Sequence, residues 1–490
     1  MPMAQYQYDI GILGGGSAGL TVAAGGARFG AKTILIEKSG KLGGDCLHYG
    51  CVPSKTLIRS AEVWAAARRS VEFGLPSLTL PPVDLKNVMD RVRDVISKIQ
   101  PHDSPERFCS LGVETHFGDA SFSGPHTLLL DGEEISAKNW VIATGSRPAT
   151  PPVKGLDDLD YLTNETIFNL KTLPKKLLIL GGGPIGIEFA QAFSSLGSEV
   201  TIIEFMDTLM PREDESISKA LIGLLKASGI ELMTSTAAKE VRREGGKVIL
   251  SVAPSDGGAA RDIFGDELLI ATGRRPNVEG LGLEKAGVEY TRRGITIDAR
   301  TRTSAKHIYA CGDVTGEMNF THVAGYHGST ALTNMVLHLP KKLDYSKVPW
   351  CIYTSPEIAG VGISEREAIE QGIKYRVLEE RFSQNDRAIA EGAEGGFLRI
   401  IASPKGKVLG ARVVGANAGE LIHEWVVAMN GKLKLSTVAG AVHAYPTLSE
   451  ISKRASGSFY EEALFGKRTT WLLRLLFGLK GSACVSPEED

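Results

Sequence analysis

Two segments of the chain repeat one pattern, and this repeat constrains the fold more than any other feature of the sequence. Residues 8–37 read as an apolar strand, a glycine-rich turn, a helical stretch and a second apolar strand that ends in an acid, and residues 177–204 read the same way. In both copies the acid follows the third glycine of the turn by 18 residues. Such a strand–turn–helix–strand unit is typical of parallel sheets that bind dinucleotides.

The glycines and the acid of each unit have separate expected roles. The first glycine allows a tight turn, the second lets the backbone approach a pyrophosphate, and the third lets the helix pack on the strand. The helix N-terminus supplies amides for the phosphates, and the acid accepts hydrogen bonds from ribose hydroxyls. One such motif is weak support, but two complete units predict two bound dinucleotides. The predicted binding residues are Gly14, Gly16, Gly19 and Glu37 in the first unit and Gly181, Gly183, Gly186 and Glu204 in the second.

A further repeated segment closes each unit. Residues 141–148 read VIATGSRP, and residues 269–276 read LIATGRRP. We interpret these segments as matching strand ends that close the two dinucleotide domains, although either one alone would equally suit an ordinary strand–turn junction. Thr144, Gly145 and Gly273 are therefore additional candidates for cofactor binding.

Composition narrows the class of function. The net charge of −2 gives no general field that would attract nucleic acid, so no nucleic-acid partner is expected. Glycine makes up 56 of 490 residues, about 11% against a usual ~7%, which indicates close backbone approach at several places. Six cysteines are too few for a disulfide scaffold, so a closely spaced pair would indicate redox chemistry or metal binding.

Cys46 and Cys51 form such a pair, shortly after the acid of the first unit. Pro53 suits the start of a helix, which places Cys51 near a helix N-terminus whose dipole favours the thiolate. A zinc site would require a second pair at ligand spacing, which the sequence lacks, so no metal ligands are predicted. Two buried core cysteines are an alternative, which Lys55 and the neighbouring dinucleotide turn disfavour.

Residues 44–55, GDCLHYGCVPSK, resemble the active-site signature of the class I FAD-dependent pyridine nucleotide–disulfide oxidoreductases. That family includes dihydrolipoamide dehydrogenase, glutathione reductase and mercuric reductase, and the likeness covers nearly the whole chain. Residues 303–313 resemble its second FAD motif, which ends here in Gly312 and Asp313, and the aspartate would hold the ribityl chain. Residues 353–357 resemble the opening of its dimerisation domain.

The resemblance implies an α/β fold with two Rossmann-like dinucleotide-binding domains, the NAD domain inserted in the FAD domain, and a C-terminal α+β dimerisation domain. FAD would bind the first unit and a nicotinamide cofactor the second, in a homodimer whose active site is shared across subunits. The expected boundaries are 1–150 and 279–345 for the FAD-binding domain, 151–278 for the NAD(P)-binding domain, 346–466 for the dimerisation domain and 467–490 for a C-terminal tail.

The chemistry of the family suits the residues at the matching positions. In the family, hydride passes from the nicotinamide to the flavin, and the flavin reduces the disulfide that Cys46 and Cys51 would form. Cys51 would be the charge-transfer thiol beside the flavin, and Cys46 the interchange thiol that meets the substrate. Lys55 and Glu188 match the family's ion pair beside flavin and nicotinamide. Glu204 favours NADH, because a carboxylate accepts the ribose 2′-OH and repels the 2′-phosphate of NADPH, although NADPH stays an option.

The segment 443–450, HAYPTLSE, departs from lipoamide and glutathione reductases. Those enzymes carry a histidine at the position of Tyr445, paired with a glutamate that matches Glu450. A phenol with a pKa of ~10 is a poor base at neutral pH, so dihydrolipoyl dehydrogenase is the alternative and not the first choice. His443 is a candidate substitute. Mercuric reductases carry tyrosine there, which suits a soft metal ion, although Cys484 stands alone where they have a cysteine pair.

We therefore predict mercuric-reductase-like electron transfer to a small disulfide or thiol-bound metal substrate. Two other classes stay open, a non-enzymatic redox-sensing flavoprotein and a membrane-surface reductase of quinones or electron carriers. The second is motivated by the apolar residues 471–479, which are far fewer than the ~20 needed to span a bilayer. They could lie on a membrane surface, but we expect a terminal helix packed on its own protein. No secretory signal is evident, so a cytoplasmic location is expected.

Overall fold

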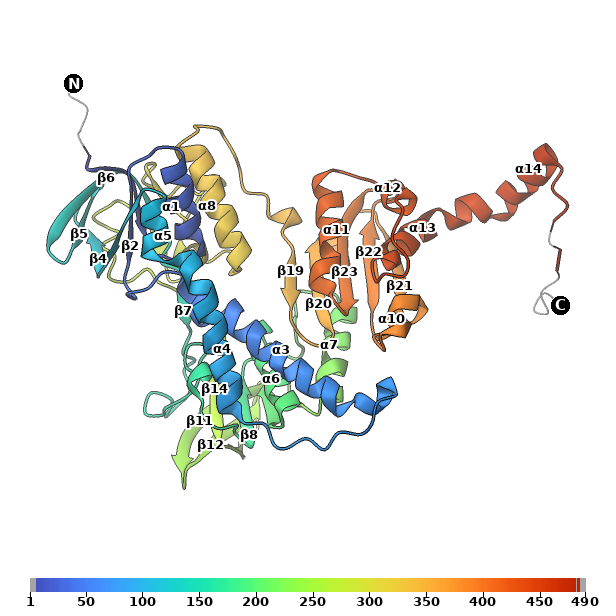
Figure 1. Ribbon diagram of the computed structural model, residues 1–490, viewed down its shortest axis with the longest axis horizontal. Coiled ribbons are helices and arrows are strands. Elements are labelled where there is room, and N and C mark those ends of the chain that lie inside the picture. The colour runs from blue at the N-terminus through green and yellow to red at the C-terminus, as the bar shows by residue number, and fades with distance from the viewer. Residues whose placement is uncertain (1–5, 482, 485–490) are drawn as a thin grey trace. The chain divides into compact units, whose positions relative to one another are not determined.

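Residues 6–481, 483 and 484 are described by a computed structural model, which divides the chain into two compact units, Met1–Tyr345 and Ser346–Asp490 (Figure 1). The first unit holds both repeated segments, and each forms the parallel sheet that its pattern predicts. In the first sheet, three parallel strands lie in the order β2 (Thr33–Glu37), β1 (Tyr8–Leu13) and β6 (Glu133–Ile142).

Two more parallel strands complete this sheet, β3 (Val113–Phe117) beside β2 and β18 (Ile308–Ala310) beside β6. Because β18 follows the second repeated segment in the chain, the second dinucleotide domain is inserted within the first. The helices α1 (Ser17–Arg28) and α8 (Thr321–Met335) pack side by side, as Figure 1 shows. The antiparallel strands β4 (Ala120–Phe122) and β5 (Thr127–Leu130) continue the sheet beyond β6.

The second repeated segment supplies the two central strands of a four-stranded parallel sheet in the order β10, β9, β8, β14. Its central strands are buried on both faces, which explains their continuous apolar sequences. A three-stranded antiparallel sheet of β11, β12 and β13 follows in the same domain. The elements are β8 (Lys176–Leu180), α6 (Pro184–Leu196), β9 (Glu199–Ile203), α7 (Glu215–Ala227), β10 (Glu231–Met233), β11 (Thr236–Glu244), β12 (Lys247–Pro254), β13 (Arg261–Gly265) and β14 (Glu267–Ile270).

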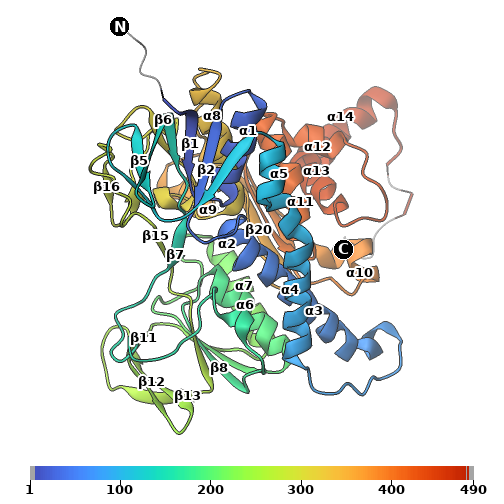
Figure 2. The same cartoon turned by 60° about the vertical axis from the view of Figure 1, so that its left-hand side comes forward.

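The two closing segments pair with each other where the chain crosses between the dinucleotide domains. β7 (Ser146–Pro148) and β15 (Arg274–Pro276) form a short antiparallel ribbon in which Ser146 lies opposite Pro276. The sequence repeat predicted two matching junctions, and the structure shows that these junctions are direct neighbours. Four α-helices lie between β2 and β3: α2 (Gly44–His48), α3 (Cys51–Arg68), α4 (Leu85–Ile99) and α5 (Pro105–Ser110). Of these, α3 and α4 run side by side (Figure 2).

The second unit is an antiparallel sheet of five strands with helices packed against it, in the order β19, β20, β23, β22, β21. Trp425 is fully buried in the apolar core beneath its helices. This is the α+β architecture that the sequence predicted. Its elements are β19 (Trp350–Ile352), β20 (Glu357–Gly362), α9 (Glu365–Glu370), β21 (Arg376–Arg381), α10 (Asp386–Ala390), β22 (Phe397–Ala402), β23 (Val408–Gly415), α11 (Ala418–Asn430), α12 (Leu435–Gly440), α13 (Glu450–Phe465) and α14 (Lys467–Phe477).

The expected packing of the last helix is wrong. Residues 471–479 were predicted to pack on their own protein, but α14 contains no buried residue. An apolar helix of this length suits a core, yet packing depends on a complementary surface that local sequence does not reveal. In the part of the chain that the structure describes, no helix has the length and apolar character that a bilayer crossing requires. The finer domain boundaries stay predictions.

Candidate active site

The first and third glycines of the first turn are required by its geometry. Gly14 has a φ of +104°, and a Cβ there would lie 2.3 Å from the carbonyl oxygen of Ala143. A Cβ on Gly19 would lie 1.9 Å from the carbonyl oxygen of Gly14, so only glycine lets α1 approach the turn. The second turn repeats both features, with the corresponding distances 2.4 Å at Gly181 and 2.2 Å at Gly186.

The second glycine of each turn faces open space instead. A Cβ on Gly16 would meet only the Cα of Gly44, at 3.8 Å, and a Cβ on Gly183 would meet nothing within 4 Å. These two glycines are also the N-caps of α1 and α6, and a glycine has no side chain that could accept from the first amides of the helix. Both turns therefore fit a dinucleotide pyrophosphate, which needs exposed helix N-terminal amides and room beside them.

The acids of the two units make the same hydrogen bonds. Glu37 Oε2 accepts from the backbone N–H of Gly15 at 2.6 Å, and Glu204 Oε2 accepts from that of Gly182 at 2.6 Å. In each unit Oε1 accepts from the backbone N–H two residues after the acid, at 2.7 and 2.8 Å. Each carboxylate is thus held against its turn, where its remaining lone pairs can accept from a ribose.

The redox turn packs directly on the first dinucleotide turn. The backbone N–H of Gly43 donates to the carbonyl of Gly15 at 2.9 Å, and a Cβ on Gly44 would lie 2.6 Å from Gly16 Cα. Gly44 also has a φ of +59°. The two glycines before the cysteines must be small because they join the thiol-bearing turn to the phosphate-binding backbone.

The pKa values of the two thiols are shifted in opposite directions. Cys51 is the first residue of α3, Cys46 lies in α2, and both are free thiols. The hydrogen bond from the Cys46 thiol is the main cause that lowers the pKa of Cys51 to about 6, helped by the Thr321 hydroxyl at 3.3 Å and by the charge of Lys55. The same hydrogen bond, with burial, raises the pKa of Cys46 well above its usual range. At neutral pH the pair is a Cys51 thiolate that accepts from a Cys46 thiol.

The structure brings Lys55 and Glu188 together as the resemblance implied. Lys55 Nζ donates to Glu188 Oε2 at 2.7 Å, and the Glu188 side chain is buried. Lys55 lies one turn after Cys51 in α3, whereas Glu188 lies in α6 of the second dinucleotide domain. The pair therefore ties the redox helix to the helix that follows the second glycine turn.

Sequence reasoning missed Arg274, whose side chain is mostly buried between the two domains of the first unit. Its Nε donates to Ser146 Oγ at 2.7 Å, and its Nη2 lies 3.3 Å from Asp45 Oδ1 of the redox turn. Ser146 Oγ in turn donates to Asp313 Oδ2 at 2.6 Å, and burial raises the pKa of Asp313. The sequence did contain a signal for Arg274. The repeated segments ATGSRP and ATGRRP differ at one position, which is Ser146 in the first and Arg274 in the second.

The remaining cofactor candidates line the junctions. Thr144 Oγ1 donates to the carbonyl of Asn277 at 2.8 Å, so its hydroxyl holds the junction together. Gly145 and Gly273 have φ values of +68° and +134°, with nothing within 4 Å of an added Cβ. Gly312 has a φ of +79°, and its Cβ would lie 3.1 Å from the Ala324 side chain of α8.

The C-terminal motif differs from its expected pairing. Tyr445 Oη donates to Asp386 Oδ2 at 2.8 Å, and this hydrogen bond is the main cause that raises the pKa of Tyr445. Glu450 Oε2 instead accepts from the backbone N–H of Thr447, at 3.4 Å. The Tyr445 side chain is 71% exposed in the single chain. Asp386, which carries no motif signal, is the second functional candidate that sequence reasoning missed.

His443 has a partner of its own. Its Nε2 lies 3.1 Å from Glu424 Oε1 in α11, and its side chain is only 9% exposed. This contact separates His443 from the Tyr445–Asp386 pair, so a substitute role for His443 stays a prediction.

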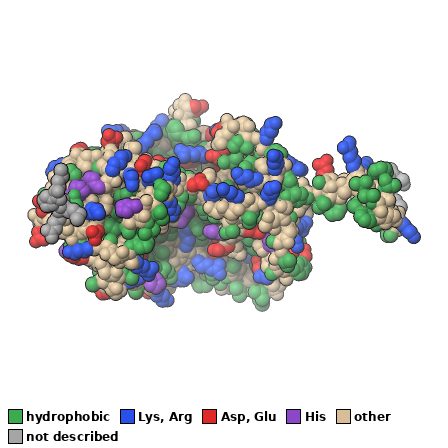
Figure 3. All heavy atoms as spheres, turned by 90° about the horizontal axis from the view of Figure 1, so that it is seen from above, with side chains coloured by type: hydrophobic (Ala, Val, Ile, Leu, Met, Phe, Trp, Pro, Cys, Tyr) green, Lys and Arg blue, Asp and Glu red, His purple; other side chains and the backbone are tan. Residues whose placement is uncertain are grey.

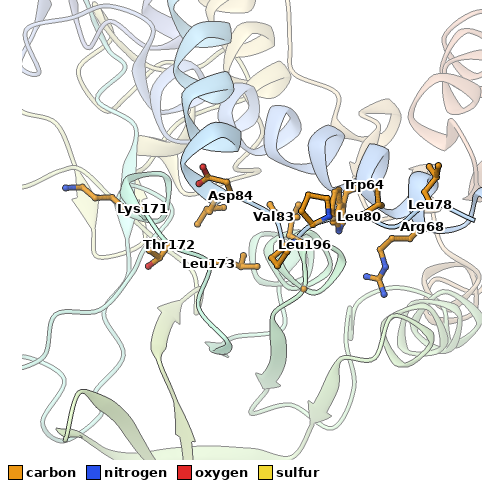
Figure 4. Close-up of a pocket in the computed structure, with 14 residues that line it drawn as sticks. Trp64, Arg68, Leu78, Leu80, Val83, Asp84, Lys171, Thr172, Leu173 and Leu196 are labelled. Atoms are coloured by element: carbon orange, nitrogen blue, oxygen red, sulfur yellow. The ribbon is translucent and has the colours of Figure 1, made fainter.

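A groove of about 770 Å³ lies away from this chemistry (Figure 4). It runs between the C-terminal part of α3, the following loop and the end of α6. Trp64, one of its lining residues, lies 13 residues after Cys51 in the same helix, which is about 20 Å along the axis. Its lining contains none of the predicted site residues: Trp64, Arg68, Leu78, Leu80, Pro81, Pro82, Val83, Asp84, Leu85, Lys171, Thr172, Leu173, Leu196 and Gly197.

Comparison with known proteins identifies the family. The sequence profile described as pyridine nucleotide-disulphide oxidoreductase matches residues 8–328, and the profile of its dimerisation domain matches residues 348–456. The chain is 35% identical to a mercuric reductase of Bacillus cereus over 456 residues, which are 93% of this chain and 72% of that protein. It is 36% identical to a dihydrolipoamide dehydrogenase of Chaetomium thermophilum over 469 residues, 93% of this chain and 92% of that protein.

A solved structure agrees with these relatives. The Cu(II) complex of the HOCl-induced flavoprotein disulfide reductase RclA from Escherichia coli superposes with a TM-score of 0.83 at 27% identity, covering 93% of this chain and 100% of that one. The predicted fold class, enzyme class and cofactors are confirmed at the level of the family. The chain therefore belongs to the class I pyridine nucleotide–disulfide oxidoreductases, enzymes that use FAD and NAD(P)H and carry a dimerisation domain.

Proposed function

We propose that the protein reduces a soft metal ion held by thiols, or a small disulfide, with electrons that pass from NAD(P)H to the Cys46–Cys51 pair. FAD, when bound, supplies the two-electron relay between the nicotinamide and this pair. The observation that carries the metal-reducing part is the hydrogen bond from Tyr445 to Asp386. It raises the pKa of a phenol that is already a weak acid, so Tyr445 stays protonated and does not act as a base.

The division between the two thiols supports this role. Cys51 is the thiolate that a charge-transfer role requires, whereas Cys46 is the protonated partner and gives up its proton when it attacks a disulfide or binds a metal ion. When this thiolate–thiol pair closes to a disulfide it gives up two electrons and one proton. A disulfide acceptor takes the electrons and the proton and leaves as one thiol and one thiolate, whereas a divalent metal ion takes the electrons and leaves as the neutral element, and the proton goes to solvent.

A dihydrolipoamide substrate is the second candidate, and the Chaetomium relative favours it. That reaction removes protons from a dithiol and therefore benefits from a base beside the cysteines. Tyr445 replaces this base here, and Asp386 holds its proton in place. The Cu(II) complex of RclA supports a metal acceptor instead.

The second unit supports a preference for NADH. Glu204 is held against its glycine turn by two backbone amides, so its charge is fixed where a 2′-phosphate would approach. We also propose that the site is completed in the homodimer, where the C-terminal motif of one subunit reaches the thiols of its partner. The exposed Tyr445 supports this arrangement.

The deciding experiment follows NADH oxidation by the purified holoenzyme with Hg(II), lipoamide, oxidised glutathione and quinones as acceptors. Hg(II) with excess thiol should give the highest kcat/KM. The matched variant Tyr445→His should gain at least about tenfold with dihydrolipoamide or lipoamide, since a positioned base contributes 10²–10⁴ in favourable cases. Lipoamide as the best acceptor of the unmodified enzyme would overturn the metal-reducing assignment.

A further inference from the structure

One exposed surface has no part in the chemistry above. We define the tail patch as the apolar side chains of α14 and its flanks that are at least 45% exposed: Leu464, Phe465, Trp471, Leu472, Leu475, Leu476, Phe477 and Leu479. Scattered exposed apolar residues are ordinary, but eight within 16 positions form a patch of the kind that contacts another molecule or a membrane. α13 is the main neighbour of α14.

The helix is amphipathic with a narrow cationic side. At 3.6 residues per turn, Lys467, Thr470 and Arg474 fall on one side of α14, and most of the tail patch falls on the rest of its circumference. Arg468 lies on the apolar side in the first turn, where a long side chain can bend away from apolar surroundings. Figure 3 shows apolar and basic side chains together on this part of the second unit.

The charged side chains within the patch and directly after it are basic. Between residues 463 and 484 the chain has four Lys or Arg side chains and no Asp or Glu, whereas Glu461 and Glu462 precede this segment in α13 and three acids follow at 488–490, outside the described residues. A second copy of the same helix would repel this one. The match to the dimerisation domain ends at residue 456, before α14 begins, so α14 lies outside the part of the chain that this domain assigns to dimer formation. An anionic lipid surface offers both the opposite charge and the apolar depth that the patch requires.

We propose that α14 lies in the headgroup region of an anionic lipid bilayer, with the tail patch toward the acyl chains and the basic side chains on lipid phosphates. Eleven residues span about 16 Å, half of the ~30 Å core, so the helix lies along the surface and does not cross it. Trp471 suits this depth, because indole rings favour the membrane interface. The inference does not depend on which acceptor the thiols reduce.

Vesicle co-sedimentation of the holoenzyme tests the proposal. The probes are phosphatidylcholine vesicles with about one quarter phosphatidylglycerol and pure phosphatidylcholine vesicles, and we expect binding to the first that weakens with salt. Two matched variants add the same charge to different sides of α14. Thr470→Asp should lower the partition coefficient about fivefold through charge alone, and Leu476→Asp at least about 50-fold, because it also places a carboxylate among the acyl chains.

Flavin content and NADH oxidation should be unchanged in both variants, which shows that each is folded. Three results would overturn the proposal: no binding to anionic vesicles at low salt, equal effects of the two variants, or dissociation of the dimer by Leu476→Asp in sedimentation velocity without lipid. The last result would show that a second copy of the chain covers the tail patch.

Discussion

The two dinucleotide turns share one backbone design but differ in what covers them. Their first and third glycines meet the same atoms at nearly the same distances, and their acids make the same pair of hydrogen bonds. In the first unit, however, an added Cβ at Gly16 would lie 3.8 Å from Gly44 Cα of the redox turn, whereas among the described residues nothing lies within 4 Å of an added Cβ at Gly183. At its second glycine the first turn therefore has the redox turn beside it, and the second turn has no such neighbour.

This difference in packing suits a tightly bound cofactor in the first unit and an exchanging cofactor in the second. A cofactor that stays bound gains from a turn whose surroundings are fixed by packing, and one that exchanges at every cycle needs an open approach. After Glu204 the chain continues with exposed Phe205 and Met206, where the first unit instead leads on to the redox cysteines. The segment after the acid, more than the glycine motif, therefore sets what each unit does.

The largest expected effect comes from one methyl group placed beside the first dinucleotide turn and one placed on the second. Gly44→Ala puts a Cβ 2.6 Å from Gly16 Cα at a φ of +59°, so we expect at least about 100-fold weaker flavin retention. Gly183→Ala should keep its flavin and raise the KM for NADH about tenfold, because its Cβ enters the space for the pyrophosphate. Flavin-to-protein absorbance ratios and NADH kinetics measure both. Equal flavin loss in the two variants would show that the two turns do not bind different cofactors.

The next effect concerns the ion pair that joins the two domains. Lys55→Met leaves the buried Glu188 carboxylate without this lysine, which should destabilise the holoenzyme by about 2 kcal/mol, a value discounted because Lys55 is partly exposed. The double variant Lys55→Met, Glu188→Leu should recover at least half of that loss. Thermal unfolding of the flavin-loaded protein measures both. No recovery in the double variant would mean that the loss comes from packing.

The acids of the two units should affect different cofactors. The unmodified enzyme should prefer NADH to NADPH by about tenfold or more in kcat/KM, and Glu204→Ala should remove most of that preference. Glu37→Ala is the matched change in the first unit, and it should weaken flavin binding without altering the nicotinamide preference. A tenfold preference of the unmodified enzyme for NADPH would contradict the assignment of Glu204.

The smallest effect is a shift in a pH profile. Because the folded pKa of Cys51 is lowered to about 6, its thiolate is present above that pH and is lost as the pH falls through it. Alkylation of Cys51 in the reduced enzyme, followed by mass spectrometry, should therefore have a midpoint near pH 6. Thr321→Val removes a hydrogen bond to the thiolate and should raise the midpoint by about half a unit. A midpoint that stays near the usual thiol value in the unmodified enzyme would refute this ionisation state.

The sequence predicted those parts of the site that are local in the chain. A glycine turn, its helix and its acid lie within 30 residues, so their spacing alone indicates their geometry. Arg274 and Thr321 reach the redox turn from more than 200 residues away, and only the fold brings them there. Tyr445 was recognised from its motif, but its partner Asp386 lies 59 positions earlier. The exposure of α14 was missed for the same reason.

If electrons leave the protein through the Cys46–Cys51 pair, replacing Cys46 should separate flavin reduction from metal reduction. NADH-driven reduction of thiol-bound Hg(II) is compared between the unmodified enzyme and Cys46→Ser, and reduction of the bound flavin by NADH is followed in the same samples. The variant should still accept electrons from NADH but lose metal reduction by at least about 100-fold. Full metal reduction by Cys46→Ser would show that electrons leave the protein by another route.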